Sequence, residues 1–171
     1  MSGRDARQAP AGPEGRGVGA PQRAEGRGAG AQMPGRLVEA TLRVRYSETD
    51  QMGIVYHAHY LVWFEIGRTE WCRAAGLPYA GMEAAGVFIP VTRVSCSFRG
   101  RPRYDDAITV RTVMRELARR GCEFAYEVSG RQGIRLAEGS THHVFADVEG
   151  RARAAPGEMV EELRRFRESR R

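Results

Sequence analysis

Short connections between runs of alternating apolar and polar residues are the feature that most constrains the fold of this chain. Four such runs follow one another, at residues 92–98, 108–114, 122–128 and 136–147. Alternation with a period of two predicts strands that bury one face. The turns between the runs are too short to hold a helical crossover, so we expect neighbouring strands to pair antiparallel.

A further strand and a long helix are predicted ahead of these runs. Residues 37–46 alternate strictly, and the side predicted to be buried carries Val38, Ala40, Leu42, Val44 and Tyr46. Residues 57–75 are predicted to form a helix, because apolar residues recur there at spacings of three and four. They are Tyr60, Trp63, Phe64, Gly67 and Trp71.

The ends and the interior of this predicted helix carry glycines with different roles. Gly76 and Pro78 fit its end. Gly67 lies inside it, where a glycine costs about 1 kcal/mol relative to alanine. We expect Gly67 to compensate by a close approach to the sheet or to a twin helix across a dimer axis.

The order of the elements predicts the fold class. After Pro156, a narrow apolar stripe on a charged background predicts a short C-terminal helix. The chain therefore runs strand, long helix, four strands, short helix. That order predicts an α+β domain in which an antiparallel sheet of about five strands wraps around one long central helix.

Composition divides the chain into a tail and one domain. Residues 1–34 are mostly Gly, Ala, Arg, Pro and Gln, have almost nothing to bury, and are predicted to be disordered. Residues 35–171 suit a single domain with one core. Met33 stands directly before this domain, so a translation start at Met33 is an open alternative to a genuine tail.

Charge and cysteine usage limit the function classes. All 27 basic residues are Arg, and the net charge of +6 suits either an anionic ligand, such as a nucleotide-bearing coenzyme, or solubility alone. Cys72, Cys96 and Cys122 lie far apart, which favours buried thiols in a reducing cytoplasm. No apolar stretch approaches the ~20 residues of a membrane helix, and no secretory signal is recognisable, so we expect a cytoplasmic protein.

Asp50 and His57 form the constellation that could carry chemistry. Asp50 lies in a Gly-containing turn seven residues before His57, where the long helix is predicted to begin. The first N–H groups of a helix lack intrahelical partners and carry the positive end of its dipole. A carboxylate facing them could attack a carbonyl while the N–H groups hold the oxyanion. The alternative is an Asp50 that only caps its turn, but apolar Met52, Ile54 and Val55 favour a pocket around it.

Two histidines near the helix start invite a metal interpretation, which the spacing disfavours. His57 and His59 are two residues apart, whereas a zinc pair on a helix needs three or four, so no metal site is predicted. At the start of a helix, the backbone N–H of His57 is expected to matter more than its ring.

Further candidates lie on the helix and after the second predicted strand. Glu65 either reaches solvent or marks a polar contact at the floor of a ligand pocket. Arg99, Arg101 and Arg103 form a basic cluster, which is either a solvated turn or a contact for coenzyme phosphates.

These residues resemble the hotdog-fold thioesterases, in the 4-hydroxybenzoyl-CoA thioesterase-like branch that includes the bacterial acyl-CoA thioesterases. The matching motif is Thr49-Asp50, then Gly53-Ile54-Val55-Tyr56-His57-Ala58-x-Tyr60 and Glu65-x-x-Arg68-Thr69-Glu70. The resemblance implies a hotdog fold and hydrolysis of an acyl-CoA to a free acid and CoA, without cofactor or metal. It also implies a homodimer with sites at the subunit interface, often paired into a tetramer.

The resemblance assigns roles residue by residue. Asp50 takes the place of the catalytic aspartate, as nucleophile or general base, and the His57 backbone amide that of the oxyanion donor. Glu65 takes the place of an acid that faces the acyl group from the neighbouring subunit in some relatives. The expected substrate contacts are therefore Glu65 and, besides it, Tyr56, Tyr60, Arg99 and Arg101.

Two other functions are weighed against this one. A hotdog domain could bind acyl-CoA without hydrolysing it, as a sensor or carrier, although the Asp50–His57 spacing argues against that alternative. The Arg-rich ends suggest nucleic-acid binding, but neither a recognised motif nor an aromatic platform supports it, so no nucleic-acid partner is expected.

Overall fold

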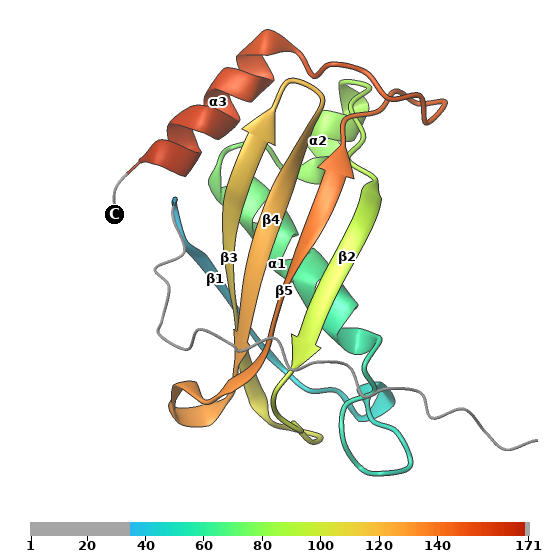
Figure 1. The fold of residues 1–171 in the computed structure, drawn as a ribbon, viewed down its shortest axis with the longest axis vertical. Helices are drawn as coiled ribbons and strands as arrows, with labels where there is room; N and C mark the ends of the chain where they lie inside the picture. Colours follow the sequence, from blue (N-terminus) through green and yellow to red (C-terminus); the bar gives the residue numbers. More distant parts are fainter. Residues whose placement is uncertain (1–34, 170–171) are drawn as a thin grey trace, which may run out of the picture. The chain divides into compact units, whose positions relative to one another are not determined.

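The computed structural model describes residues 35–169. The tail predicted over residues 1–34 lies outside the described residues. Five strands form one sheet: β1 (Val38–Arg43), β2 (Val91–Phe98), β3 (Ala107–Ala118), β4 (Gly121–Ser129) and β5 (Arg135–Val144). They lie in the order β1-β3-β4-β5-β2, and each neighbouring pair is antiparallel, as predicted. Strands β1 and β2 are therefore the two edges of the sheet (Figure 1).

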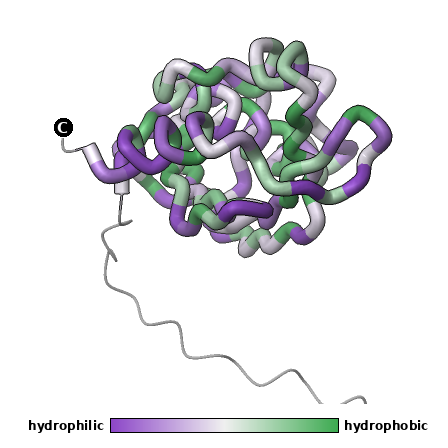
Figure 2. The backbone as a smooth tube through the Cα atoms, turned by 90° about the horizontal axis from the view of Figure 1, so that it is seen from above, coloured by the Kyte–Doolittle hydropathy of each residue, from purple (hydrophilic) through white to green (hydrophobic). Residues whose placement is uncertain are grey.

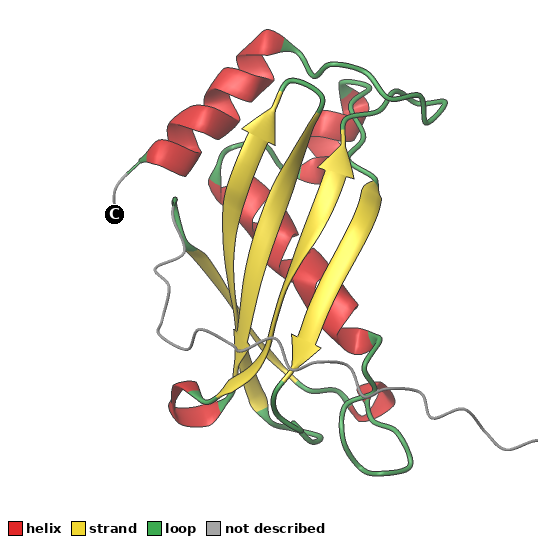
Figure 3. Cartoon of the chain, in the orientation of Figure 1, coloured by secondary structure: helices red, strands yellow, loops and turns green. Residues whose placement is uncertain are grey.

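One long helix, α1 (His59–Ala74), lies across one face of this sheet (Figure 3). The other helical elements are α2 (Tyr79–Ala84), α3 (Gly157–Glu168) and the short 3₁₀ turns η1 (Tyr46–Glu48) and η2 (Arg131–Gly133). This arrangement confirms the predicted α+β hotdog fold. Helix α2 was not predicted.

The core lies between α1 and the sheet, and the aromatic residues of α1 fill it. Trp63, Phe64 and Trp71 are fully buried. Phe64 stacks on Tyr126 of β4, with ring centroids 4.3 Å apart and planes within 7°. Burying side chains of this size contributes roughly 1.5–3 kcal/mol each, so the predicted buried face of α1 holds the helix in place.

Gly67 allows α1 to approach the sheet closely, which confirms one of the two predicted explanations. A Cβ at this position would collide with the Thr112 hydroxyl and would lie 2.9 Å from Cγ1 of Val110, both on β3. The backbone of α1 therefore lies closer to β3 than any larger residue would allow.

Helix α3 packs its apolar stripe onto the same core. Met159, Val160 and Leu163 are buried, and the Phe166 ring lies 5.0 Å from the Trp71 ring. The rest of α3 is charged, and Figure 2 shows this segment beside the C-terminus mostly in hydrophilic colours. The stripe therefore serves packing, as predicted. Among residues 35–169, no helix is both long and apolar enough to cross a membrane.

Several predicted element boundaries are wrong. Strand β1 ends at Arg43, and Tyr46 lies in η1 with 79% of its surface exposed, so it does not belong to the buried face. Val44 still bonds to the segment before β3, since its N–H donates to the Asp106 carbonyl (3.0 Å), and the chain turns into η1 after it. Strand β5 ends at Val144, three residues before its predicted end at Asp147.

Candidate active site

Asp50 sits in a tight turn that its own side chain helps to close. Its backbone N–H donates to the Ile54 carbonyl (2.9 Å), and its carbonyl accepts the Gly53 N–H (2.9 Å). Oδ1 accepts the Met52 N–H (2.8 Å). Among residues 35–169, no hydrogen bond reaches the other carboxylate oxygen, Oδ2. One oxygen therefore caps the turn and the second is available to a ligand or a water molecule.

Helix α1 begins two residues later than predicted, and backbone N–H groups that donate to no described residue still lie directly before it. Helix α1 begins at His59 and not at His57, which lies in the turn before it. The His59 N–H donates to the Tyr56 carbonyl (3.0 Å) and the Tyr60 N–H to the His57 carbonyl (3.3 Å). Within the described residues, the backbone N–H groups of His57 and Ala58 donate no hydrogen bond, so they are free to donate to an oxyanion.

Asp50 and His57 line one cavity of about 430 Å³, and Ala58 is not part of its lining. Its lining consists of Asp50, Ile54, Val55, His57, Tyr60, Phe98, Arg99, Gly100 and Arg101. The structure thus brings together five of the seven predicted site residues, from the loop after β1, the start of α1 and the end of β2. Figure 1 shows the start of α1 and the end of β2 at the same, lower end of the domain.

Tyr60 forms the buried wall of this cavity. The residue is 3% exposed, and its ring lies 5.0 Å from Phe98 and 4.8 Å from Trp63. Its hydroxyl is 3.5 Å from the Gly100 carbonyl. Burial raises the pKa of Tyr60 to about 12, so the hydroxyl stays neutral and can donate a hydrogen bond.

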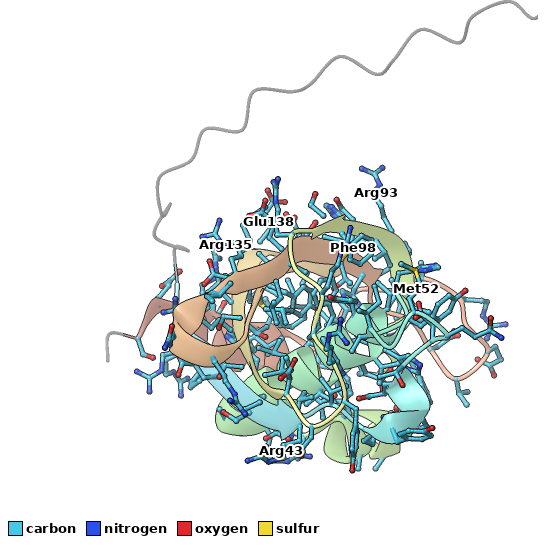
Figure 4. The ribbon with its side chains drawn as sticks, turned by 90° about the horizontal axis from the view of Figure 1, so that it is seen from below. Arg43, Met52, Arg93, Phe98, Arg135 and Glu138 are labelled. Atoms are coloured by element: carbon cyan, nitrogen blue, oxygen red, sulfur yellow. The ribbon has the colours of Figure 1, made fainter. Side chains whose placement is uncertain are left out.

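Tyr56 lies beside the cavity and not in its lining. Its ring is 47% exposed and packs on the His57 ring, with centroids 4.2 Å apart. Met52 is 69% exposed, so the pocket predicted from the apolar loop residues is only partly right: Ile54 and Val55 line it and Met52 does not. Viewed from below, Met52 and Phe98 lie on the same side of the domain (Figure 4).

The two arginines of the cavity differ in how they are paired. Arg99 donates from Nη2 to Oε1 of Glu138 on β5 (2.8 Å), and this bond lowers the pKa of the Glu138 carboxyl. Arg101 is exposed and makes no ion pair within the described part of the chain. Arg101 is therefore better placed than Arg99 to meet an anionic group of a ligand.

Glu65 does not line the Asp50 cavity. Its side chain is 64% exposed and lies 3.8 Å from Arg68, whose own side chain is 12% exposed. Both line a second cavity of about 420 Å³, between α1, α2 and the segment before β2. The Glu65 cavity includes Pro90 and the Asp50 cavity includes Phe98, so the two lie at opposite ends of β2.

Two residues near Asp50 were missed by the sequence analysis. Phe98 is the last residue of the strand predicted over residues 92–98, yet it lines the cavity while 49% exposed. Glu48 is 1% exposed although it lies in a loop, where a glutamate is ordinarily solvated. No local pattern in the sequence distinguishes it from a surface residue.

Residues 35–169 contain no group of three His, Cys, Asp or Glu side chains that could hold a metal ion. His142 and His143 face opposite sides of β5: His143 is 3% exposed, while the His142 side chain is 39% exposed.

Known proteins with similar sequences and structures share this architecture. The chain is 36% identical over 108 residues to the putative acyl-CoA thioesterase YneP of Bacillus subtilis, covering 63% of this chain and 78% of the relative. The crystal structure of the hypothetical protein TT1821 from Thermus thermophilus matches with a TM-score of 0.71 and 41% identity, over 75% of this chain and 98% of that one.

A second solved structure, the DHNA-CoA thioesterase from Staphylococcus aureus, matches with a TM-score of 0.72 and 26% identity, over 75% of this chain and 89% of that one. The profile of the thioesterase-like superfamily matches residues 44–164, which include both cavities and every predicted site residue. The protein is therefore a member of the thioesterase-like superfamily.

Proposed function

We propose that this thioester hydrolase cleaves acyl-CoA to a free acid and CoA, with Asp50 and the N–H groups before α1 as its catalytic machinery. The observation that carries the proposal is the shared cavity, which Asp50 and His57 both line. Within residues 35–169, Oδ2 of Asp50 and the N–H of His57 make no hydrogen bond. The relatives named as acyl-CoA thioesterases support the substrate class.

Asp50 acts on the thioester carbonyl, either directly as a nucleophile or as the base that takes a proton from the attacking water. As the carbonyl carbon becomes tetrahedral, its oxygen gains negative charge, which the His57 N–H and the helix dipole stabilise. A single donor of this kind is worth roughly 2.7–4 kcal/mol in comparable sites. Collapse of the intermediate breaks the carbon–sulfur bond, and the CoA thiolate that leaves takes up a proton, which Asp50 returns if it acted as the base. If Asp50 acted as the nucleophile, a water molecule then hydrolyses the acyl-Asp50 anhydride, which frees the acid and protonates the thiolate.

The remaining cavity residues suit the two ends of such a substrate. Tyr60 and Phe98 offer an aromatic wall to the acyl or pantetheine chain. Arg101, and Arg99 to a smaller extent because it is paired, lie at the mouth where coenzyme phosphates would pass. Tyr56 shields the His57 side of the cavity by packing on its ring.

We further propose that the protein is a homodimer joined through β2. This edge strand exposes Val91, Val94 and Phe98 by 41%, 42% and 49%. An edge strand eight residues long with exposed apolar side chains tends to pair with another strand. Two copies related by a twofold axis would pair their β2 strands antiparallel.

Such pairing would complete the site. In an antiparallel β2–β2 pair, the Phe98 end of one copy lies beside the Val91 end of the other. The Asp50 cavity of one subunit would then adjoin the Glu65 cavity of its partner. Glu65, which is distant from Asp50 within one chain, would thus reach the acyl group from the second copy. Further pairing of dimers into a tetramer is compatible with this arrangement.

Release of free thiol from a panel of short, long and aromatic acyl-CoA esters tests the activity. We expect turnover of at least one ester, at a rate that depends on the acyl group. Binding of acyl-CoA without thiol release from any ester would contradict hydrolysis and favour a sensor or carrier.

Mixing two weakly active variants tests whether the site is shared between subunits. We expect Asp50→Asn and Glu65→Ala each to be weakly active alone, and a refolded equimolar mixture to regain about a quarter of wild-type activity. Half of the dimers are then mixed, and each has one intact site out of two. If the mixture stays as inactive as its components while sedimentation confirms mixed dimers, the site does not span subunits.

A further inference from the structure

A buried carboxylate, Glu48, belongs to the Asp50 loop, the connection of residues 44–58 between β1 and α1. The residue is 1% exposed, whereas Tyr46 and Met52 of the same loop are 79% and 69% exposed. A carboxylate removed from water is costly unless hydrogen bonds and opposite charge compensate it. The contacts of Glu48 therefore show which groups compensate for its burial and what they hold together.

Glu48 first closes the turn that leads out of β1. Its Oε2 accepts the backbone N–H of Arg45 (2.8 Å), and its Oε1 accepts Nε and Nη2 of the same guanidinium at 3.2 and 2.9 Å. Burial alone raises the pKa of Glu48, but the hydrogen bonds from Arg45 and Trp63 outweigh it and keep the pKa below its usual range. The group is thus a fixed, ionised acceptor.

Glu48 also ties the loop to α1. Oε1 lies 3.3 Å from the indole nitrogen Nε1 of Trp63, which is fully buried on the helix and donates to it. The backbone carbonyl of Glu48 accepts the Tyr56 N–H (2.9 Å). One residue therefore contacts the segment before Asp50, the segment before His57 and the core of the helix.

We propose that Glu48 is a positioning residue, which fixes the distance between the Asp50 carboxylate and the N–H groups at the start of α1. Asp50 is two residues beyond Glu48, and His57 directly follows the Tyr56 that Glu48 holds. Without the carboxylate, the backbone bond from the Tyr56 N–H to the Glu48 carbonyl remains, but the bond from Trp63 that ties this loop to the core of α1 is lost. This inference rests on the proposed function of Asp50 and His57.

The consequence concerns turnover more than binding. A displacement of about 1 Å between reacting groups can cost about a hundredfold in rate. Loosening the loop leaves Tyr60, Phe98 and Arg101 in place, since Tyr60 belongs to α1 and the others to the end of β2 and the segment after it. Loss of Glu48 should therefore lower kcat and leave KM nearly unchanged.

Glu48→Gln and Trp63→Phe test the inference with small changes in shape. Glu48→Gln keeps an acceptor for the indole N–H and loses the charge that holds Arg45. Trp63→Phe keeps an aromatic ring in the core and loses the donor. We expect Glu48→Gln to lower kcat about tenfold to a hundredfold, with KM within about twofold, and Trp63→Phe to lower kcat less.

Glu123→Gln is the matched control. Glu123 on β4 is 7% exposed and accepts a hydrogen bond from Arg115 (3.3 Å), but it contacts no residue of the Asp50 loop. Its variant should lose stability to a similar degree while keeping kcat. All variants are assayed well below their unfolding midpoints, which circular dichroism provides.

The outcomes separate the inference from the proposed function. Absence of thiol release by the wild-type protein overturns the proposed function. Wild-type turnover together with unchanged kcat in folded Glu48→Gln overturns the positioning role alone, as does an equal fall of kcat in Glu123→Gln. If Glu48→Gln does not fold, Trp63→Phe decides by the same criterion: a lower kcat at an unchanged KM supports the role, and a wild-type kcat refutes it.

Discussion

The close approach of α1 to the sheet makes a quantitative prediction at Gly67. Replacing Gly67 by Ala adds a Cβ that collides with the hydroxyl of Thr112 and lies 2.9 Å from Cγ1 of Val110. Both neighbours are β-branched, and β-branched side chains have few alternative rotamers. Neither side chain can therefore easily make room.

Two opposing terms set the size of the effect. An alanine stabilises a helix interior by about 1 kcal/mol relative to glycine. Overpacking of a well-filled core costs typically about 1–3 kcal/mol, and a collision with two stiff side chains belongs to the upper half of that range. The net destabilisation should be about 1–2 kcal/mol, which lowers Tm by about 2–8 °C for a domain of this size.

Urea unfolding followed by circular dichroism, at one fixed protein concentration, measures this difference. Gly157→Ala is the control, since a Cβ at the first residue of α3 meets nothing within 4 Å. The double variant Gly67→Ala/Thr112→Ala should recover part of the loss, because it removes the collision with a hydroxyl that has no hydrogen-bond partner within residues 35–169. A Gly67→Ala protein as stable as Gly157→Ala, or more stable than wild type, would refute the close approach.

Three buried side chains that contact one another on β4 and β5, Tyr126, Thr141 and His143, give two further predictions. Burial lowers the pKa of His143 from 6.5 to about 4, so the folded protein keeps this imidazole neutral. The unfolded chain binds a proton there below about pH 6.5, so the stability of the folded protein falls as the pH drops from about 6.5 towards 4. The loss amounts to about 3 kcal/mol at most. Between pH 7, 5 and 4, the urea midpoint of unfolding should therefore fall less steeply in His143→Gln than in the wild type. An equally steep fall in both proteins would exclude His143 as the cause. Tyr126→Phe removes a hydroxyl that lies 2.6 Å from Oγ1 of Thr141, and because Thr141 keeps its 2.7 Å contact with Nε2 of His143, the variant should lose only about 1 kcal/mol in urea unfolding; a loss several times larger would mean that the hydroxyl supports more than this bond.

The periodic parts of the chain were predictable because a strand or a long helix repeats its buried face locally. The strand runs, the aromatic face of α1 and the compensation at Gly67 are all of this kind. Helix α2 escaped prediction because Tyr79–Ala84 is too short for a helical period to be recognised.

The start of α1 could not be located from the sequence, for a related reason. Ala58 already has helical dihedral angles (φ −63°, ψ −27°) and no side-chain cap marks the boundary. Tyr46 was misplaced because alternation alone does not reveal where a strand ends.

Some residues of the candidate site were likewise predictable from the sequence, and others were not. Asp50, His57 and Tyr60 are near in sequence, and the segment after β2 joins them because β2 ends beside the start of α1. Glu48 is different, since its burial depends on an indole fifteen residues away on the helix. Glu65 lies outside the Asp50 cavity because its helical position points it to another surface of the domain.

Turnover by Asp50→Asn is the most direct test of the central claim, that one carboxylate oxygen performs the chemistry while the other only holds the turn. The asparagine keeps an oxygen for the Met52 N–H, so the loop should persist and CoA should bind as before. Loss of a base or nucleophile should lower kcat by at least about a hundredfold. Asp105→Asn, at an exposed loop carboxylate paired with Arg43 (3.5 Å), should leave kcat unchanged. Hydrolysis of acyl-CoA at the wild-type rate by a folded Asp50→Asn protein would contradict the account.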